Sequence, residues 1–113
     1  MHEVSIMTEA MRMAVESAQA AGAGCITGLR LRVGKLSGAA PEAMTFAWDV
    51  VRQNTMASTA TLTIETVPAA GWCAVCQTEF ECEDFFNECP RCHNISDELR
   101  RGRELEIASV EMN

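Results

Sequence analysis

The stretch Cys73–Cys92 decides the fold of this chain, and it reads CAVCQTEFECEDFFNECPRC. It contains two C-x-x-C pairs, Cys73 with Cys76 and Cys89 with Cys92. Each pair lets two thiolates reach one ion from a single backbone turn, and two such turns complete a tetrahedron. The spacing predicts one closed four-cysteine metal site, in preference to two unrelated pairs of buried thiols or disulfides. Zinc is favoured over iron, because a borderline-soft ion without redox chemistry suits four thiolates.

A closed site of four thiolates leaves no coordination position for a substrate, so its expected role is structural. The surrounding residues 69–101 have too few apolar side chains for a core of their own. Bound metal is therefore expected to supply their folding free energy. We expect residues 69–101 to form a zinc-binding insert in an α+β domain made of residues 1–68 and 102–113.

The sequence outside this insert predicts two helices and three strands. Apolar residues recur at three- and four-residue spacing in both predicted helices, and they alternate with polar residues in the predicted strands. The predicted fold class is α+β, with a small mixed sheet of about three strands packed with two helices, plus a zinc-ribbon-like insert that carries the four paired cysteines. The elements, in chain order, are a helix over 4–21, a strand over 28–33, a helix over 41–54, and strands over 60–67 and 104–110.

Composition excludes several classes of function. The 113 residues carry sixteen acidic and nine basic side chains, and the net charge of -7 has the wrong sign for coating a phosphate backbone. No apolar stretch reaches the roughly 18 residues that span a bilayer, and the start lacks the features of a secretory signal. Six cysteines without an export signal indicate reduced thiols and a cytoplasmic location. We recognise no phosphate-binding loop and no nucleophile–base pair, so catalytic residues are not expected and the chain is not expected to be an enzyme.

His2 is the second candidate for metal binding. A histidine in second place puts three nitrogens within chelating reach: the α-amine of Met1, its own backbone amide and its imidazole. Nitrogen donors in one plane suit Ni(II) or Cu(II) better than tetrahedral zinc. Glu3 could add a backbone nitrogen or a carboxylate. The alternative is a frayed terminus without a ligand role.

One histidine and two cysteines stand outside these candidates. Cys82 lies between the pairs and His93 directly follows Cys92, and either could replace a thiolate, with His93 giving a site of three cysteines and one histidine. The four cysteines of two equally spaced pairs need no substitute. Both side chains are therefore expected beside the site or at the surface, where His93 could tune the site with pH. Cys25 is expected to be a small buried residue at the start of a strand.

Several short motifs follow one another along the chain, and their order is more specific than any one of them. They are Met1-His2-Glu3 before a helix, Gly34-Lys-Leu-Ser-Gly38 leading into Pro41-Glu-Ala43, Phe46-Ala-Trp-Asp-Val50, the two cysteine pairs, and Gly102-Arg-Glu-Leu-Glu-Ile107 with Ser109-Val-Glu111. In this order, over nearly its full length, the chain resembles the HypA/HybF family of hydrogenase nickel-insertion proteins.

The resemblance implies a nickel-binding α+β domain with a zinc-ribbon insert. Such a protein works with a GTPase of the HypB type and supplies nickel to the large subunit of [NiFe]-hydrogenase. Residue by residue, His2 matches the family's nickel ligand with Met1 and Glu3 as nearby donors, and the four paired cysteines match its zinc ligands. Some members have an acidic residue in the loop before the second helix. Here residues 39–40 are alanines, so Glu42 is the only near candidate.

The expected function is that of a nickel metallochaperone, with zinc as a structural ion, nickel as cargo, and a monomer or weak homodimer as the working form. No nucleic-acid or membrane partner is expected. The alternative is a zinc-ribbon adaptor or nucleic-acid-binding module in which His2 is incidental. Its nucleic-acid version is disfavoured by the net charge and by only six Phe and Trp residues, none flanked by a basic cluster. A third possibility is a rubredoxin-like electron carrier, whose iron would colour the protein red.

Overall fold

The computed structural model describes residues 3–82 and 87–113 of the chain. These residues divide into two compact units. The first consists of residues 3–32, 39–65 and 106–113, and the second of residues 33–38 and 66–105, apart from the residues that are not described. The second unit is thus built from two separate segments of the chain.

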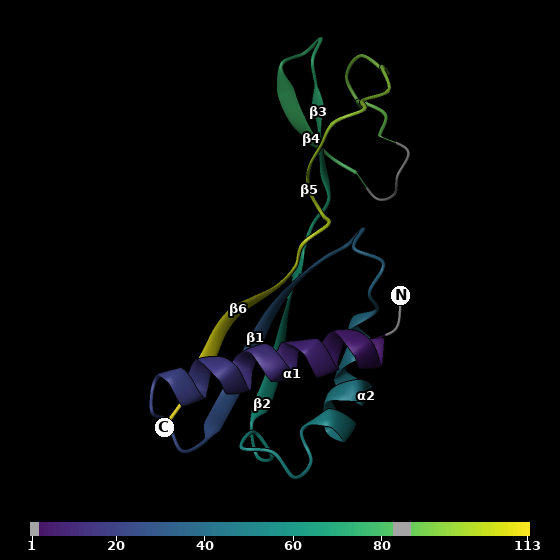
Figure 1. Cartoon of the computed structure of the whole chain (residues 1–113). Coiled ribbons are helices and arrows are strands. Elements are labelled where there is room, and N and C mark those ends of the chain that lie inside the picture. The colour runs from purple at the N-terminus through teal and green to yellow at the C-terminus, as the bar shows by residue number, and fades with distance from the viewer. Residues whose placement is uncertain (1–2, 83–86) are drawn as a thin grey trace. The chain divides into compact units, whose positions relative to one another are not determined.

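Figure 1 shows helix α1 (Glu3–Ala20). The helix buries a stripe of small and flexible apolar side chains. Two of them, Met7 and Met11, are buried in the core. Val4 and Met13 are exposed, and the buried stripe continues through Ala10, Ala14 and Ala18.

A glycine, Gly22, ends α1. Gly22 has a φ of 73°, in the left-handed region that glycine adopts without steric cost. The N–H of Ala23 donates to the carbonyl oxygen of Ala18 at 2.9 Å, and that of Gly22 donates to Gln19 at 3.0 Å. These two bonds form a Schellman motif, which satisfies carbonyl groups that the end of the helix leaves without partners.

Helix α2 (Pro41–Val51) begins with proline in its first turn, as predicted. It packs against α1 and buries Met44, Ala47 and Trp48. The indole N–H of Trp48 donates to the carbonyl oxygen of Ala60 at 3.3 Å, so the one polar atom of this buried ring has a partner. The helix ends earlier than the predicted Asn54, whose φ of 61° is incompatible with a continuing helix.

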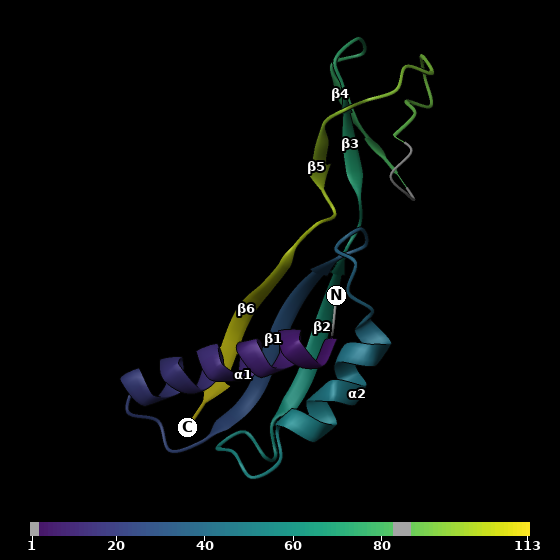
Figure 2. The same ribbon diagram turned by 45° about the vertical axis from the view of Figure 1, so that its right-hand side comes forward.

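The first sheet has the strand order β2-β1-β6, with β1 at Ile26–Gly34, β2 at Thr61–Val67 and β6 at Leu105–Met112. β1 and β2 run in one direction and β6 runs back, so the sheet is mixed (Figures 1 and 2). The closing strand therefore pairs with the earlier ones, as expected. On β1, Leu29 and Leu31 are buried while Arg30 is exposed, which confirms the predicted alternation.

A second sheet was not predicted. Its order is β4-β3-β5, with β3 at Ala70–Cys73, β4 at Thr78–Glu81 and β5 at Leu99–Arg101. β3 is antiparallel to both neighbours. Strands of three or four residues are too short to show a recognisable alternation, so their residues carry no signal for them. Together with the cysteine group described below, this sheet forms the zinc-ribbon-like part of the predicted fold class.

Candidate metal centre

The structure brings the four paired cysteines together in the second unit. The sulfur atoms of Cys73, Cys76, Cys89 and Cys92 all lie within 4.8 Å of one another, and no other such group of His, Cys, Asp or Glu side chains occurs among the described residues. The sulfurs of Cys73 and Cys92 are 3.4 Å apart. A tetrahedral zinc ion with Zn–S bonds of about 2.3 Å has sulfurs about 3.8 Å apart. The donor set and its spacing fit such an ion.

The two cysteine pairs are followed by the same kind of backbone turn. The residue that follows each pair has a positive φ, 50° at Gln77 and 63° at His93. Both turns direct backbone N–H groups toward the first sulfur of the pair: Cys76 donates to the sulfur of Cys73 at 3.4 Å, and Cys92 and Arg91 donate to that of Cys89. Such bonds stabilise thiolates, which are the form that binds metal.

The thiols of this group have pKa values that move in opposite directions. Backbone N–H groups of Cys92 and Arg91 lower the pKa of the Cys89 thiol to about 6. Hydrogen bonding to Cys92 and burial raise the pKa of the Cys76 thiol to about 12. Interacting groups titrate as a set, so the Cys89 thiolate forms readily while the Cys76 thiol keeps its proton. A cation at the centre would displace that proton, because coordination favours the thiolate form.

A small apolar core supports the four cysteines. Cys73 and Cys89 are buried together with Ala69, Phe80 and Cys82, and half-buried leucines from elsewhere in the unit pack against this cluster. Cys82 is therefore a packing residue near the site, and its sulfur does not belong to the group of four. The unit thus has a core, but a small one in which cysteines are prominent.

The other two candidates lie apart from the group of four sulfurs. His93 has an exposed side chain, and its Nδ1 lies 3.1 Å from a carboxylate oxygen of Glu88. Cys25 is half-buried just before β1, so the expectation of a fully buried residue was wrong. The backbone of Cys25 is paired with the last residue of the chain: its carbonyl oxygen accepts the N–H of Asn113 at 3.0 Å.

The predicted nickel donors Met1 and His2 lie outside the described residues, so their role stays a prediction. Glu3 is the first residue of α1 and is half-buried. Its carboxylate accepts a hydrogen bond from the backbone N–H of Ala40, immediately before α2, at 3.2 Å. Glu42, the other carboxylate considered, is exposed on the first turn of α2.

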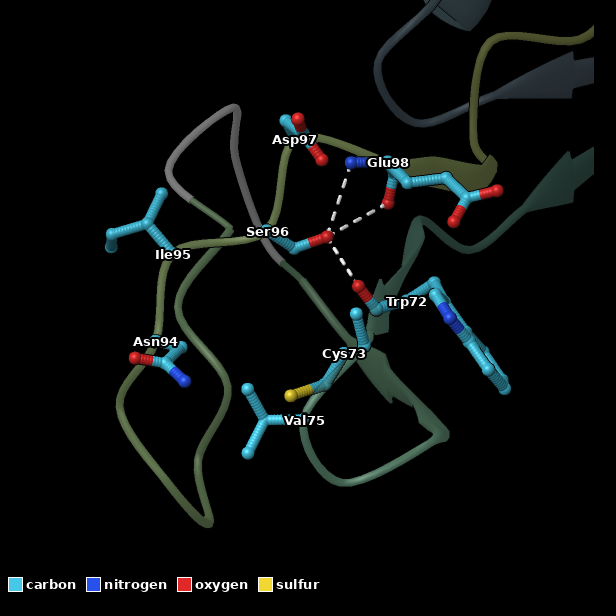
Figure 3. Close-up of a pocket in the computed structure, with 9 residues that line it drawn as sticks. Trp72, Cys73, Val75, Asn94, Ile95, Ser96, Asp97 and Glu98 are labelled. Atoms are coloured by element: carbon cyan, nitrogen blue, oxygen red, sulfur yellow. Dashed lines mark hydrogen bonds between the residues drawn. The ribbon is translucent and has the colours of Figure 1, made fainter.

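An open cleft of about 230 Å³ borders the cysteine group. Figure 3 shows Cys73 and Val75 on one side of it and Asn94 on the other. Ser96 closes one end, where its hydroxyl contacts the carbonyl oxygen of Trp72 and accepts the N–H of Glu98 at 3.1 Å. The hydroxyl thus joins β3 to the segment that leads into β5.

No helix among the described residues is long and apolar enough to cross a membrane.

Two helices with a mixed sheet, joined to a unit that gathers four cysteines, define a small α+β protein with a zinc-ribbon-like module. Residues 1–112 match the family model described as hydrogenase/urease nickel incorporation, metallochaperone, hypA. The chain therefore belongs to the HypA family, which the sequence motifs had indicated. That family is one of metallochaperones rather than of enzymes.

Full-length relatives support this assignment. The chain is 44% identical over 112 residues to the hydrogenase maturation factor HypA of Picosynechococcus sp., covering 99% of each chain. It is 36% identical over the same length to the HypA of Rhizobium leguminosarum bv. viciae, again with 99% of each chain covered.

Solved structures show the same fold. The solution structure of the Ni metallochaperone HypA from Helicobacter pylori matches with a TM-score of 0.68 at 22% identity, over 99% of this chain and 97% of that one. A second solution structure, of a HypA protein, matches with a TM-score of 0.71 at 23% identity, over 100% and 97% of the two chains. At these identities the likeness concerns the fold alone.

Proposed function

We propose that this member of the HypA family binds Ni(II) at its N-terminus and delivers it to the large subunit of a [NiFe]-hydrogenase during maturation. The observation that carries the proposal is the family match from residue 1 to residue 112, together with a histidine in second place. The donors are the α-amine of Met1, the backbone nitrogen and imidazole of His2, and a further donor from Glu3, either its backbone nitrogen or its carboxylate. The ion is cargo, so a site at the end of the chain suits ligand exchange with an acceptor.

The four-cysteine group is proposed to hold zinc through Cys73, Cys76, Cys89 and Cys92. Four sulfur donors in a closed arrangement suit Zn²⁺ and leave no position for cargo. We propose that this ion stabilises the second unit, while nickel passes through the N-terminus. Nickel would then be bound by the domain made of residues 1–68 and 102–113, and zinc by the insert of residues 69–101.

The proposed partners are a GTPase of the HypB type and the hydrogenase large subunit. Support comes from the family description, which concerns nickel incorporation, and from relatives described as hydrogenase maturation factors. The competing function is a zinc-ribbon adaptor without a nickel role. The two functions differ in one measurable property, which is nickel binding that depends on the N-terminus.

Nickel titration of the untagged protein tests the proposal. His2→Ala removes the imidazole and the chelate ring that includes it, so nickel affinity should collapse while zinc content and melting temperature persist. Several residues added before Met1 move the α-amine away from His2 and should also abolish tight binding. A single added residue puts the histidine third, where an amine, two amides and an imidazole complete a square plane.

Calorimetry and absorption spectroscopy should therefore show lost binding for the long extension, and a yellow, diamagnetic complex for the short one. Unchanged nickel binding by both His2→Ala and the long extension would place the nickel site elsewhere in the chain and refute the proposal.

A further inference from the structure

Helix α2 carries apolar side chains on two opposite faces. Met44, Ala47 and Trp48 are buried in the first unit. Phe46 and Val50 stand four positions apart, and therefore on one face of the helix, yet they are 76% and 58% exposed. A helix that is apolar all round is normally buried on all sides. The core of the first unit accounts for the buried set and leaves the exposed pair unexplained.

The outer face of α2 consists of five exposed residues, which are Glu42, Ala43, Phe46, Asp49 and Val50. At 3.6 residues per turn, Phe46 lies in the middle of this face. Ala43 and Val50 lie to one side of it, and Glu42 and Asp49 lie to the other side. The outer face is thus apolar along one side and acidic along the other.

The acidic side of the outer face keeps a negative charge. Asp49 is partly compensated, because its Oδ1 atom lies 3.3 Å from Nε of Arg52. Glu42 is exposed in the first turn of the helix. The whole chain adds to this field, since its net charge is -7. A Lys or Arg beside the apolar side chains of a partner would therefore be attracted, and it would orient the contact.

A second copy of the chain is a poor occupant of this face. A two-fold interface brings the same patch of both copies together. If the two helices were antiparallel, the same side of each would meet, so Glu42 and Asp49 would lie against their own copies. If they were parallel, the acidic side of each would cover the apolar side of the other. Both arrangements bury carboxylates without a cation, which is unfavourable.

We infer that the outer face of α2 docks a segment of another protein that carries apolar side chains with Lys or Arg along one side. Phe46 is the central apolar contact, since aromatic side chains dominate the energetics of such surfaces. Glu42 selects the charge of the partner. The inference goes beyond the proposed function, because it involves no nickel. A single helix face is smaller than the surface that stable complexes bury, so the contact is transient.

A synthetic helical peptide tests the inference. It has leucines at three- and four-residue spacing, lysines along one side of the leucine stripe and glutamines along the other. A matched peptide has glutamate in place of every lysine. Each is titrated into the full-length, isotope-labelled protein and followed through backbone amide NMR signals. The lysine peptide should give saturable shifts centred on α2, weakened by salt. The glutamate peptide should bind at least about tenfold more weakly, because like charges then meet.

Three variants assign the contact to side chains. Phe46→Ser should weaken the lysine peptide at least about tenfold with an unchanged melting temperature, and Val50→Ser should weaken it less. Glu42→Lys should reverse the preference, so that the glutamate peptide binds more tightly. Met13→Gln is the matched control, because Met13 is another exposed apolar side chain, on α1, and its loss should leave peptide binding unchanged.

Several results would overturn the inference. They are the absence of saturable shifts with the lysine peptide, shifts centred outside α2, undiminished binding in both Phe46→Ser and Val50→Ser, and an unchanged preference in Glu42→Lys. Analytical ultracentrifugation adds one more. A dimer of the parent protein that becomes a monomer in Phe46→Ser would make a second copy the occupant of this face.

Discussion

Gly34 lies so close to Gly102 that a side chain at position 34 would collide with the Gly102 backbone. A Cβ atom on Gly34 would lie 2.2 Å from both the carbonyl carbon and the carbonyl oxygen of Gly102. The N–H of Leu36 donates to that same oxygen at 2.6 Å, and the N–H of Gly34 donates to Glu104 at 2.7 Å. The end of β1 is thereby joined to the segment between β5 and β6.

Gly34→Ala should destabilise the protein by about 1–3 kcal/mol, the usual cost of forcing extra atoms into a packed region. Two backbones must separate to admit the methyl group, and the hydrogen bonds beside it lengthen. Thermal and urea unfolding measure the loss. Gly24→Ala is the matched control, because its nearest heavy atom would be a carbonyl oxygen at 3.9 Å. It should stay within about 0.5 kcal/mol of the parent. Equal stability of the two variants would contradict the close approach.

Phe46 and Trp48 are near neighbours on α2 with opposite environments. Trp48 is 3% exposed and Phe46 is 76% exposed. Trp48→Ala should cost about 3–5 kcal/mol because it leaves a cavity in the core of the first unit. Phe46→Ser should change the free energy of unfolding by no more than about 0.5 kcal/mol. Urea unfolding followed by circular dichroism checks both. A large loss in Phe46→Ser would show that this ring is covered in solution.

Zinc content should depend on each of the four grouped cysteines. Cys→Ser at Cys73, Cys76, Cys89 or Cys92 removes one donor, and a structural zinc ion contributes on the order of 10 kcal/mol of folding free energy. These variants should be poor in metal and cleaved rapidly by protease in the second unit.

Cys82→Ala and Cys25→Ser are the controls for this series and should retain full zinc by elemental analysis. Alanine is preferred at position 82 because the side chain is buried and a hydroxyl there would need a partner. Loss of zinc in Cys82→Ala together with retention of zinc in Cys89→Ser would show that Cys82, and not Cys89, is a zinc ligand.

Zinc affinity should depend on pH with a change of slope near pH 6. Above that pH Cys89 binds as a thiolate, because its pKa is lowered to about 6, whereas Cys76, with its pKa raised to about 12, must release a proton. Below pH 6 the Cys89 thiol must also release a proton when zinc binds. The slope of the logarithm of zinc affinity against pH should therefore increase by about one below pH 6. Competition with a chromophoric chelator between pH 5 and 8 measures it. A constant slope would contradict the lowered pKa.

The same lowered pKa sets the pH dependence of stability in the metal-free protein. An acid whose pKa is depressed on folding stabilises the fold above its ordinary pKa, which is 9.0 for this thiol. That contribution declines as the pH falls below 9.0 and is lost once it passes through about 6. Metal-free protein should therefore unfold more easily at pH 6 than at pH 8 by this contribution.

The larger elements were predictable because their side-chain patterns are long. Eighteen residues of α1 give several turns over which the apolar period can be read, and β1 alternates over most of its length. The strands of the second unit have three or four residues, and Gly71 of β3 has no side chain to show a pattern. It pairs with Phe80, whose ring would lie 2.8 Å from a Cβ at Gly71. Such a contact depends on the tertiary structure and leaves no periodic signal.

The cysteine group was predictable from spacing alone, because a C-x-x-C pair specifies its own turn. The hydrogen bond from the N–H of Ala40, at the start of α2, to the carboxylate of Glu3 was not predictable, because these two residues are 37 positions apart. One signal was present: the helix starts Ala-Ala-Pro, without the Ser, Thr, Asp or Asn that usually precedes a helix. A missing local cap indicates that a partner comes from elsewhere, but it does not name the partner.

The second unit is built from two separate stretches of sequence, and this limits how it can be transferred to another protein. Its residues 33–38 comprise the last two residues of β1 and the first part of the loop that leads to α2, and Leu36 packs against the core beside the cysteines. A fragment of residues 66–105 would carry every cysteine of the group and lack that leucine. The complete zinc-ribbon-like unit therefore cannot be transferred to another protein as one continuous segment. Its transfer would require a second insertion that brings the loop with it.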